Sequence, residues 1–240
     1  MLSHEIRPRG DRSRTPVVLA VFSYRYDAHL VPDLLANLEP IVSGWVAFDD
    51  RGSEALYSNE PARRCALVTR ARELGADWVL GIDPDERLER GAADRMREMT
   101  RVEGPVAWGF RLRELYAPDA YRVDGVWGRK EQFRLFPLLP DQRFSEKAFH
   151  GAWIPIEPTH TRLRSELNLY HLKMIAPARR RARRDLYNHV DPDRAYQRIG
   201  YDYLADESGL ALEAIPAGRG YVPPHVDDGL LWMAPTPPRK

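Results

Sequence analysis

Three carboxylates that follow a buried apolar run are the residues of this chain best suited to chemistry. Residues 78–82 are apolar, and Asp83-Pro84-Asp85-Glu86 comes directly after them. Such a run is typical of a strand that is covered on both faces. Carboxylates this close together repel one another unless a cation or hydrogen-bond donors compensate their charge. A divalent metal ion that also holds a phosphorylated ligand would provide that compensation.

A second acidic pair ends another apolar run. Residues 45–48 are apolar, and Asp49 and Asp50 follow them before a turn at Gly52. The hydrophobic pattern predicts strands at 17–22, 45–48 and 78–82, each followed by a helix, at 31–41, 60–74 and 91–99. This alternation predicts a parallel sheet with right-handed crossovers. Because parallel strands end at the same edge of a sheet, both acidic groups should lie at one crevice.

The hydrophobic pattern changes after Gly104. Residues 106–112 and 167–172 alternate between apolar and polar side chains, as half-exposed strands do, and residues 133–136 predict a short strand. We expect a very basic helix at 178–189 and a last helix near 193–204. No internal repeat or flexible linker divides the chain.

Composition narrows the classes of function. The chain has 240 residues, 43% of them apolar and 30% charged, with a formal net charge of +1. These values are ordinary for a soluble protein and give no general field for binding nucleic acid. The single cysteine, Cys65, fits a reducing compartment, and no apolar run is long enough for an integral membrane segment. We therefore expect a cytoplasmic protein, with a membrane-peripheral location as the alternative.

The order and spacing of these motifs resemble the GT-A fold of the family 2 glycosyltransferases. That family opens with a strand and a Tyr-containing loop, here Phe22-Ser23-Tyr24-Arg25. Its second strand ends in paired acids, here Asp49-Asp50, and its third carries an Asp-x-Asp motif, here Asp83-Pro84-Asp85. The match covers residues 17–99 and continues loosely through Arg134-Leu135-Phe136, His150-Gly151 and Tyr170-His171-Leu172.

The resemblance implies an α/β fold with a single GT-A-like domain. Its central sheet would be mostly parallel and flanked by helices, with a helical C-terminal segment. Residues 1–15 would form a flexible arm, 16–104 the nucleotide-sugar-binding half, 105–225 the acceptor-binding half with the C-terminal helices, and 226–240 a tail.

The implied activity is metal-dependent transfer of a sugar, with inversion, from a nucleoside-diphosphate sugar to a hydroxyl of a glycan or small molecule. Two alternatives stay open. One is a degenerate GT-A protein that binds a nucleotide sugar or a partner without catalysis. The other is a sugar nucleotidyltransferase, although the Gly-rich phosphate loop that such enzymes usually carry early in the chain is missing here.

The resemblance also assigns roles to single residues. Donor binding would involve Phe22 through its backbone, Tyr24, Asp50, Arg64 or Arg63, Asp83, and Lys173 or the arginines at 179–184. The ligands of a Mn²⁺ or Mg²⁺ ion would be Asp85, with Asp83 and His171 beside it. Hard divalent ions prefer carboxylate, phosphate and water, and Mn²⁺ tolerates an imidazole better than Mg²⁺ does. Replacing Asp85 by Ala should abolish donor turnover and leave the fold intact.

The catalytic base is where the chain departs from the family. Several relatives carry a Glu directly after a His, but here Gly151 follows His150. We expect a displaced carboxylate, preferably Glu146, or else His150 itself, to act as the base. Trp127, between two glycines, is the preferred residue for stacking on the acceptor sugar, ahead of Trp108 and Trp153.

Simpler interpretations exist for the same residues. The acids at 83–86 could belong to a solvated turn, and His171 could be a hydrogen-bonded histidine of the core or its rim. The arginines at 179–184 are most simply explained as a solvated, partly ion-paired helix face. Only the combination of two acidic strand ends with His171 favours a metal–nucleotide site.

Overall fold

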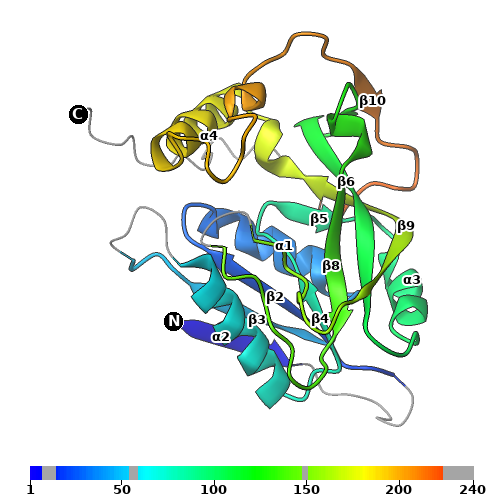
Figure 1. The fold of residues 1–240 in the computed structure, drawn as a ribbon. Coiled ribbons are helices and arrows are strands. Elements are labelled where there is room, and N and C mark those ends of the chain that lie inside the picture. Colours follow the sequence, from blue (N-terminus) through cyan, green and yellow to red (C-terminus); the bar gives the residue numbers. More distant parts are fainter. Residues whose placement is uncertain (7–14, 54–58, 148–150, 224–240) are drawn as a thin grey trace.

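A sheet of ten strands runs through the chain, which the computed structural model describes at residues 1–6, 15–53, 59–147 and 151–223 (Figure 1). The main path is, in order, β1 (Leu2–Ile6), β3 (Gly44–Asp49), β2 (Val18–Tyr24), β4 (Trp78–Gly81), β8 (Glu131–Pro137), β6 (Val106–Ala117), β7 (Ala120–Arg122) and β10 (Leu212–Ala214). Two further strands, β5 (Glu86–Leu88) and β9 (Thr161–His171), pair with each other, and β9 also pairs with β6. The α/β class is therefore confirmed.

The directions of the strands correct the expectation of a mostly parallel sheet. β2 is parallel to β3 and β4, and β6 is parallel to β9. The other strand pairs in the described part of the chain are antiparallel. Parallel neighbours need long crossovers, usually helices, and here such helices precede β3 and β4. After β4 the chain returns through antiparallel pairs, and β8 from the second half lies directly between β4 and β6.

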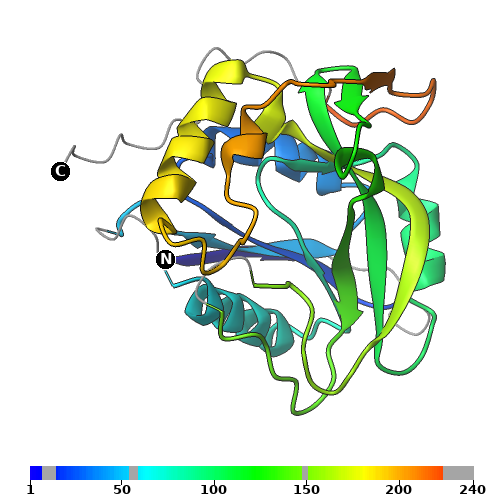
Figure 2. The same cartoon turned by 45° about the horizontal axis from the view of Figure 1, so that its top comes forward.

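Helices cover both faces of the parallel strands. Helices α1 (Val31–Leu38) and α3 (Ala92–Met99) lie on one face, and α2 (Glu60–Glu73) lies on the other (Figure 2). In β2, Ala20 shares a buried cluster with Leu34 of α1, whereas Leu19 shares one with Leu67 of α2. Both faces of β2 are thus buried, which explains why its sequence is apolar without alternation.

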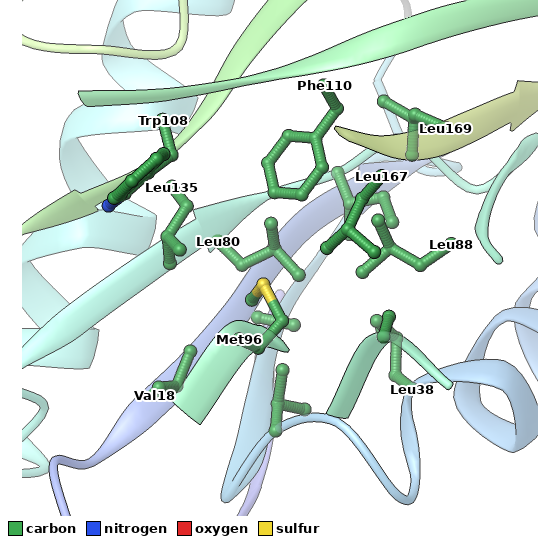
Figure 3. Close-up of a cluster of buried hydrophobic side chains, with 14 of the residues drawn as sticks. Val18, Leu38, Leu80, Leu88, Met96, Trp108, Phe110, Leu135, Leu167 and Leu169 are labelled. Carbon is green, nitrogen blue, oxygen red and sulfur yellow. The ribbon is translucent and has the colours of Figure 1, made fainter. Parts of the chain in front are cut away.

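The larger core cluster joins the two halves of the chain. Leu80 of β4, Phe110 of β6, Leu135 of β8, Leu167 of β9 and Met96 of α3 converge there (Figure 3). All five are buried. Since strands from the first and second halves share this cluster, the sheet edge that carries the acidic residues is rigidly connected to β6 and β9.

The N-terminal residues correct the expectation of a flexible arm at 1–15. β1 is an antiparallel edge strand on β3, with Leu2 opposite Phe48, and residues 7–14 lie outside the described part. Every side chain of β1 is exposed, so no hydrophobic pattern marked it in the sequence. The close approach leaves no space for a side chain at Gly44, because a Cβ there would collide with the Glu5 carbonyl.

Helix α4 (Pro177–Val190) lies close to the span predicted for a basic helix. The second helix expected at 193–204 is wrong except for a 3₁₀ turn, η4 (Asp202–Leu204). The Asp191 carboxylate accepts hydrogen bonds from the backbone N–H groups of Ala195, Tyr196 and Gln197 and from the Tyr201 hydroxyl. These bonds stabilise a folded loop in place of a helix. The tail predicted at 226–240 lies outside the described residues.

Shorter 3₁₀ helices are η1 (Ala28–Leu30), η2 (Trp127–Arg129) and η3 (Leu172–Met174). Among the described helices, none combines the length and the apolar character that crossing a bilayer would require.

Candidate active site

A pocket of about 680 Å³ opens where β2, β3 and β4 end. Its lining includes most of the predicted site residues, namely Tyr24, Asp50, Arg64, Asp83, Asp85, His171 and Lys173. The expectation that the two acidic strand ends meet at one crevice is therefore confirmed. A pocket of this size lies within the range that suits cofactors and drug-sized ligands.

The end of β3 directs one carboxylate into this pocket. The Asp50 side chain is buried, and its Oδ2 lies 2.5 Å from Nη1 of Arg63 on α2. The Asp50 N–H donates to the Tyr24 carbonyl at 3.0 Å, which ties the ends of β3 and β2 together. Asp49 instead pairs with the exposed Arg51. The two neighbouring acids therefore differ, since only Asp50 is in a position to contact a ligand in the pocket.

Three cationic side chains surround the carboxylate of Asp85. Its side chain is 3% exposed, and its Oδ2 lies 2.8 Å from Nη2 of Arg183 and 3.2 Å from Nη2 of Arg179, both on α4. Its Oδ1 lies 3.3 Å from Nε2 of His171. Burial alone would raise the pKa of Asp85, but His171 and the two arginines hold that pKa well below its usual range.

His171 connects Asp85 to a second buried carboxylate, Glu114. The Nδ1 of His171 lies 3.1 Å from Oε2 of Glu114, whose Oε1 is 3.2 Å from Lys130 and 3.6 Å from Lys173. Burial and Lys173 act to lower the pKa of His171, but the carboxylates of Glu114 and Asp85 outweigh them and raise it. Negative and positive groups therefore alternate in the pocket lining, in the order Asp85, His171, Glu114 and Lys173.

Glu114 is a site residue that the sequence interpretation missed. It lies on β6, where Val106, Trp108, Phe110 and Leu112 alternate as buried positions. Glu114 continues this alternation and is fully buried. The sequence did contain a signal for Glu114, namely a carboxylate at a position of the strand where apolar residues alternate. Such a charge is buried on folding and therefore requires partners.

The other two acids of the motif share one cation. Arg134 of β8 places its Nη2 3.0 Å from Oδ2 of Asp83 and 2.5 Å from Oε1 of Glu86. The second Glu86 oxygen accepts the Asp83 N–H at 2.9 Å. Burial, opposed by Arg134, raises the pKa of Glu86 to about 7. The repulsion among the three acids is thus relieved in two separate groups, with Arg134 on one side and His171 with the α4 arginines on the other.

Asp85 and His171 form a hydrogen-bonded ion pair rather than a preformed metal site. Nε2 of His171 lies 3.3 Å from Oδ1 of Asp85, and the raised pKa of His171 favours a proton on this nitrogen, which then cannot bind a metal ion. Arg179 and Arg183 already pair with Oδ2 of Asp85. The described residues contain no group of three or more His, Cys, Asp or Glu side chains suited to a metal. A divalent ion held by Asp85 and His171 would have to displace the proton of His171.

Arg64 and Gly151 lie side by side in the lining of the pocket. Nη2 of Arg64, on α2, donates to the Gly151 carbonyl at 3.1 Å, and the guanidinium lies 5.4 Å from the ring centroid of Trp153. A Cβ on Gly151 would lie only 2.9 Å from Nη1 of Arg64. The Arg64 guanidinium therefore occupies the space that a side chain at position 151 would need, which explains the glycine at this position.

The remaining predicted site residues lie elsewhere. The Phe22 side chain belongs to the core, so only its backbone remains available to a ligand. Glu146 is exposed and is not among the described residues that line the pocket, and His150 lies outside the described part. Trp127 is 4% exposed, with the Lys130 ammonium 3.9 Å from its ring centroid. Trp153 lines the pocket instead, so the preference for Trp127 as the stacking residue is wrong.

No protein-family model and no curated protein matches this chain in sequence. Its function is therefore argued from the pocket.

Proposed function

We propose that this protein is a GT-A-type glycosyltransferase that moves a sugar from a nucleoside-diphosphate sugar to an acceptor hydroxyl, with inversion. One observation carries the proposal: Asp50 and Asp85 follow the two parallel strands that flank β2, and both line one pocket together with His171. Acids at two such strand ends, with a third donor from late in the chain, are what the resemblance to family 2 implies. The parallel order β3–β2–β4 with both faces covered also supports it.

The nucleoside would bind at the Asp50 end of the pocket. The Asp50 carboxylate can accept hydrogen bonds from a base or ribose, and its pairing with Arg63 fixes its orientation. Tyr24 lines the same region and presents a ring with a polar hydroxyl. Arg63, which contacts Asp50 directly, is thus a better candidate for this end than Arg64, which faces Gly151.

The diphosphate would bind toward Asp85, where positive charge is concentrated. Arg183, His171 and Lys173 line this part of the pocket. Departure of a nucleoside diphosphate builds negative charge on phosphate oxygens, and fixed cationic donors stabilise that charge. A divalent ion held by Asp85 and His171 would, when bound, add positive charge next to both phosphates.

A thermal-shift screen tests this function. The folded protein is heated with UDP-, GDP-, dTDP- and ADP-sugars, each with and without Mn²⁺. We expect one nucleotide class to raise the melting temperature, and to do so more strongly with Mn²⁺, because a ligand that binds only the folded state stabilises it by mass action. If no nucleotide sugar shifts the melting temperature at millimolar concentration, the proposal is wrong.

A further inference from the structure

We propose that Glu60, the first residue of α2, is the catalytic base of the transfer, an inference that rests on the proposed glycosyltransferase function. The acceptor hydroxyl is a poor nucleophile, so a nearby group must take its proton. The base must line the pocket, must not be tightly held by a cation, and must lie away from the phosphate-binding end. The carboxylates of the pocket differ sharply in these three respects.

Most of the pocket carboxylates are held by a cation. The ion pairs are Asp50 with Arg63 at 2.5 Å, Asp83 with Arg134 at 3.0 Å, Asp85 with Arg183 at 2.8 Å, Glu86 with Arg134 at 2.5 Å, Glu114 with Lys130 at 3.2 Å and Glu131 with Arg164 at 2.9 Å. A carboxylate held this way is a weak proton acceptor, because the cation stabilises its charged form. In the described part of the pocket this leaves Asp27 and Glu60.

The surroundings of these two carboxylates distinguish them. Asp27 accepts the Arg25 N–H at 3.1 Å, and its charged neighbours are Asp85, Arg183 and Arg179, at the proposed diphosphate end. Glu60 lies 3.8 Å from Nη2 of Arg64, accepts a hydrogen bond from the backbone of Gly151, and has Arg64, Asp83 and Arg63 as its charged neighbours. A base for the acceptor belongs on the side of the sugar that faces away from the leaving diphosphate. Asp27, beside the proposed diphosphate end, does not meet this condition, which leaves Glu60.

An aromatic ring, Trp153, lines the pocket near Glu60, with the guanidinium groups of Arg64 and Arg134 beside it. The indole packs on β4 where a Cβ at Gly81 would come within 2.5 Å of the ring. Sugars present apolar C–H faces that pack on aromatic rings. Arg64 connects the two elements, since it contacts both Trp153 and Glu60. An acceptor sugar on Trp153 would bring its hydroxyl toward Glu60.

Glu60 is well anchored for this role. It begins α2, and the preceding Asn59 caps the helix by accepting the Ala62 N–H at 3.0 Å. Its side chain is 23% exposed, so its carboxylate can be reached from the pocket. Burial raises the pKa of Glu60, Arg64 opposes this rise and the charge of Asp83 adds to it. A raised pKa makes a carboxylate a better acceptor of a proton near neutral pH.

The chemical step balances without a further reactant. The acceptor oxygen attacks the anomeric carbon from the Glu60 side while its proton passes to the Glu60 carboxylate. The bond between the anomeric carbon and the diphosphate oxygen breaks, and the electron pair leaves with the nucleoside diphosphate. Attack from the face opposite the leaving group inverts the anomeric centre. Glu60 then loses its proton to solvent.

The test measures release of nucleoside diphosphate from the nucleotide sugar that gives the largest thermal shift, with water as the acceptor. We compare the wild-type protein with Glu60→Gln, Asp27→Asn and Glu131→Gln. Glu60→Gln should lower kcat by about 100-fold or more, while calorimetry shows unchanged affinity for the nucleoside diphosphate and the melting temperature stays the same. Glu131→Gln is the matched control, because Glu131 lines the pocket but pairs with Arg164. It should keep the wild-type rate.

Three results would overturn the assignment of Glu60. The first is an unchanged kcat in Glu60→Gln. The second is a loss confined to Asp27→Asn, which would make Asp27 the base. The third is a loss of nucleoside-diphosphate affinity or of melting temperature in Glu60→Gln that accounts for its lower kcat, which would make Glu60 a binding or structural residue. Failure of the proposed function looks different, because the wild-type protein would then bind no nucleoside diphosphate.

Discussion

Nε2 of His171 lies 3.3 Å from Oδ1 of Asp85, so the end of β9 contacts the acidic loop after β4. The contact is fixed by the backbone, because β5 and β9 pair with Glu86 opposite His171, and the Leu172 N–H donates to the Asp85 carbonyl at 2.8 Å. Two segments that are distant in the sequence are thus positioned by strand pairing rather than by flexible side chains.

Replacing Asp85 by Ala should destabilise the fold, contrary to the expectation from the sequence. The change would leave the buried guanidinium of Arg179 and the imidazole of His171 without their shared counter-charge. Removing one partner of a buried ion pair typically costs about 3–5 kcal/mol. Chemical denaturation measures the free energy of unfolding. Asp94→Ala on the exposed face of α3 is the control and should change stability by no more than about 0.5 kcal/mol. Equal stability of Asp85→Ala and the wild-type protein would refute the importance of this charge cluster.

Replacing Asp50 by Asn should weaken nucleotide binding without unfolding the protein. The substitution keeps the shape of the side chain but removes the charge that orients Arg63 and accepts ligand hydrogen bonds. A lost charged hydrogen bond is worth about 1.5–3 kcal/mol, which corresponds to roughly 10- to 150-fold in Kd. Asp49→Asn is the control, because Asp49 is the adjacent acid but pairs with the exposed Arg51 and the Tyr24 hydroxyl instead of Arg63. If both variants bind a nucleoside diphosphate equally well, Asp50 is not part of the site.

Replacing Gly151 by Ala should disturb Arg64. The added Cβ would lie 2.9 Å from Nη1 of Arg64, so the guanidinium must move away from the Gly151 carbonyl and from Trp153. Inserting a methyl group into a filled site typically costs about 1–3 kcal/mol, and we expect about 1 kcal/mol here because the group that must move is the end of a flexible arginine side chain. Gly52→Ala is the control, since nothing lies within 4 Å of a Cβ there. The melting temperature of Gly151→Ala should fall below that of Gly52→Ala, and the reverse order would contradict the proposed packing.

Asp27 should make stability depend on pH below neutrality. Burial, reinforced by the charge of Asp85, raises the pKa of Asp27 to about 6, above its value of 3.8 in an unfolded chain. The folded state therefore holds this proton more tightly, and its contribution to stability is present below about pH 4 and is lost as the pH rises toward 6. Asp27→Asn removes this cost. The variant should be more stable than the wild-type protein by about 1–3 kcal/mol at pH 7.5, and the difference should vanish near pH 4. A constant difference at both pH values would contradict the raised pKa.

The sequence predicted the parallel part of the fold because burial of β2, β3 and β4 on both faces leaves continuous apolar runs. It also predicted that Asp50 and Asp85 meet, since parallel strands share an edge. β1 was missed because none of its side chains is buried. The antiparallel return through β8 was missed because alternation shows that a strand has one covered face but does not show which neighbour it pairs with.

The arginines of α4 show why the charge network could not be predicted. In the sequence they form a basic helix that is most simply interpreted as solvated, yet Arg179 is 1% exposed and Arg180 is also buried. Arg179 is buried because Asp85, far away in the chain, provides its counter-charge. Arg134 and Glu114 are likewise stabilised by distant partners. Single residues gave no signal of these pairings, so Lys173 and the arginines of α4 were considered as phosphate-binding cations but not as partners of Glu114 and Asp85.

Calorimetric titration of the folded protein with UDP, GDP, dTDP and ADP, with and without Mn²⁺, tests the proposed function most directly. We expect one of these nucleoside diphosphates to bind with micromolar affinity in the presence of Mn²⁺ and more weakly after chelation. We also expect that Asp50→Asn weakens this binding and Asp49→Asn does not. Absence of binding by all four nucleotides to the folded protein, with Mn²⁺ present, would contradict the proposed function.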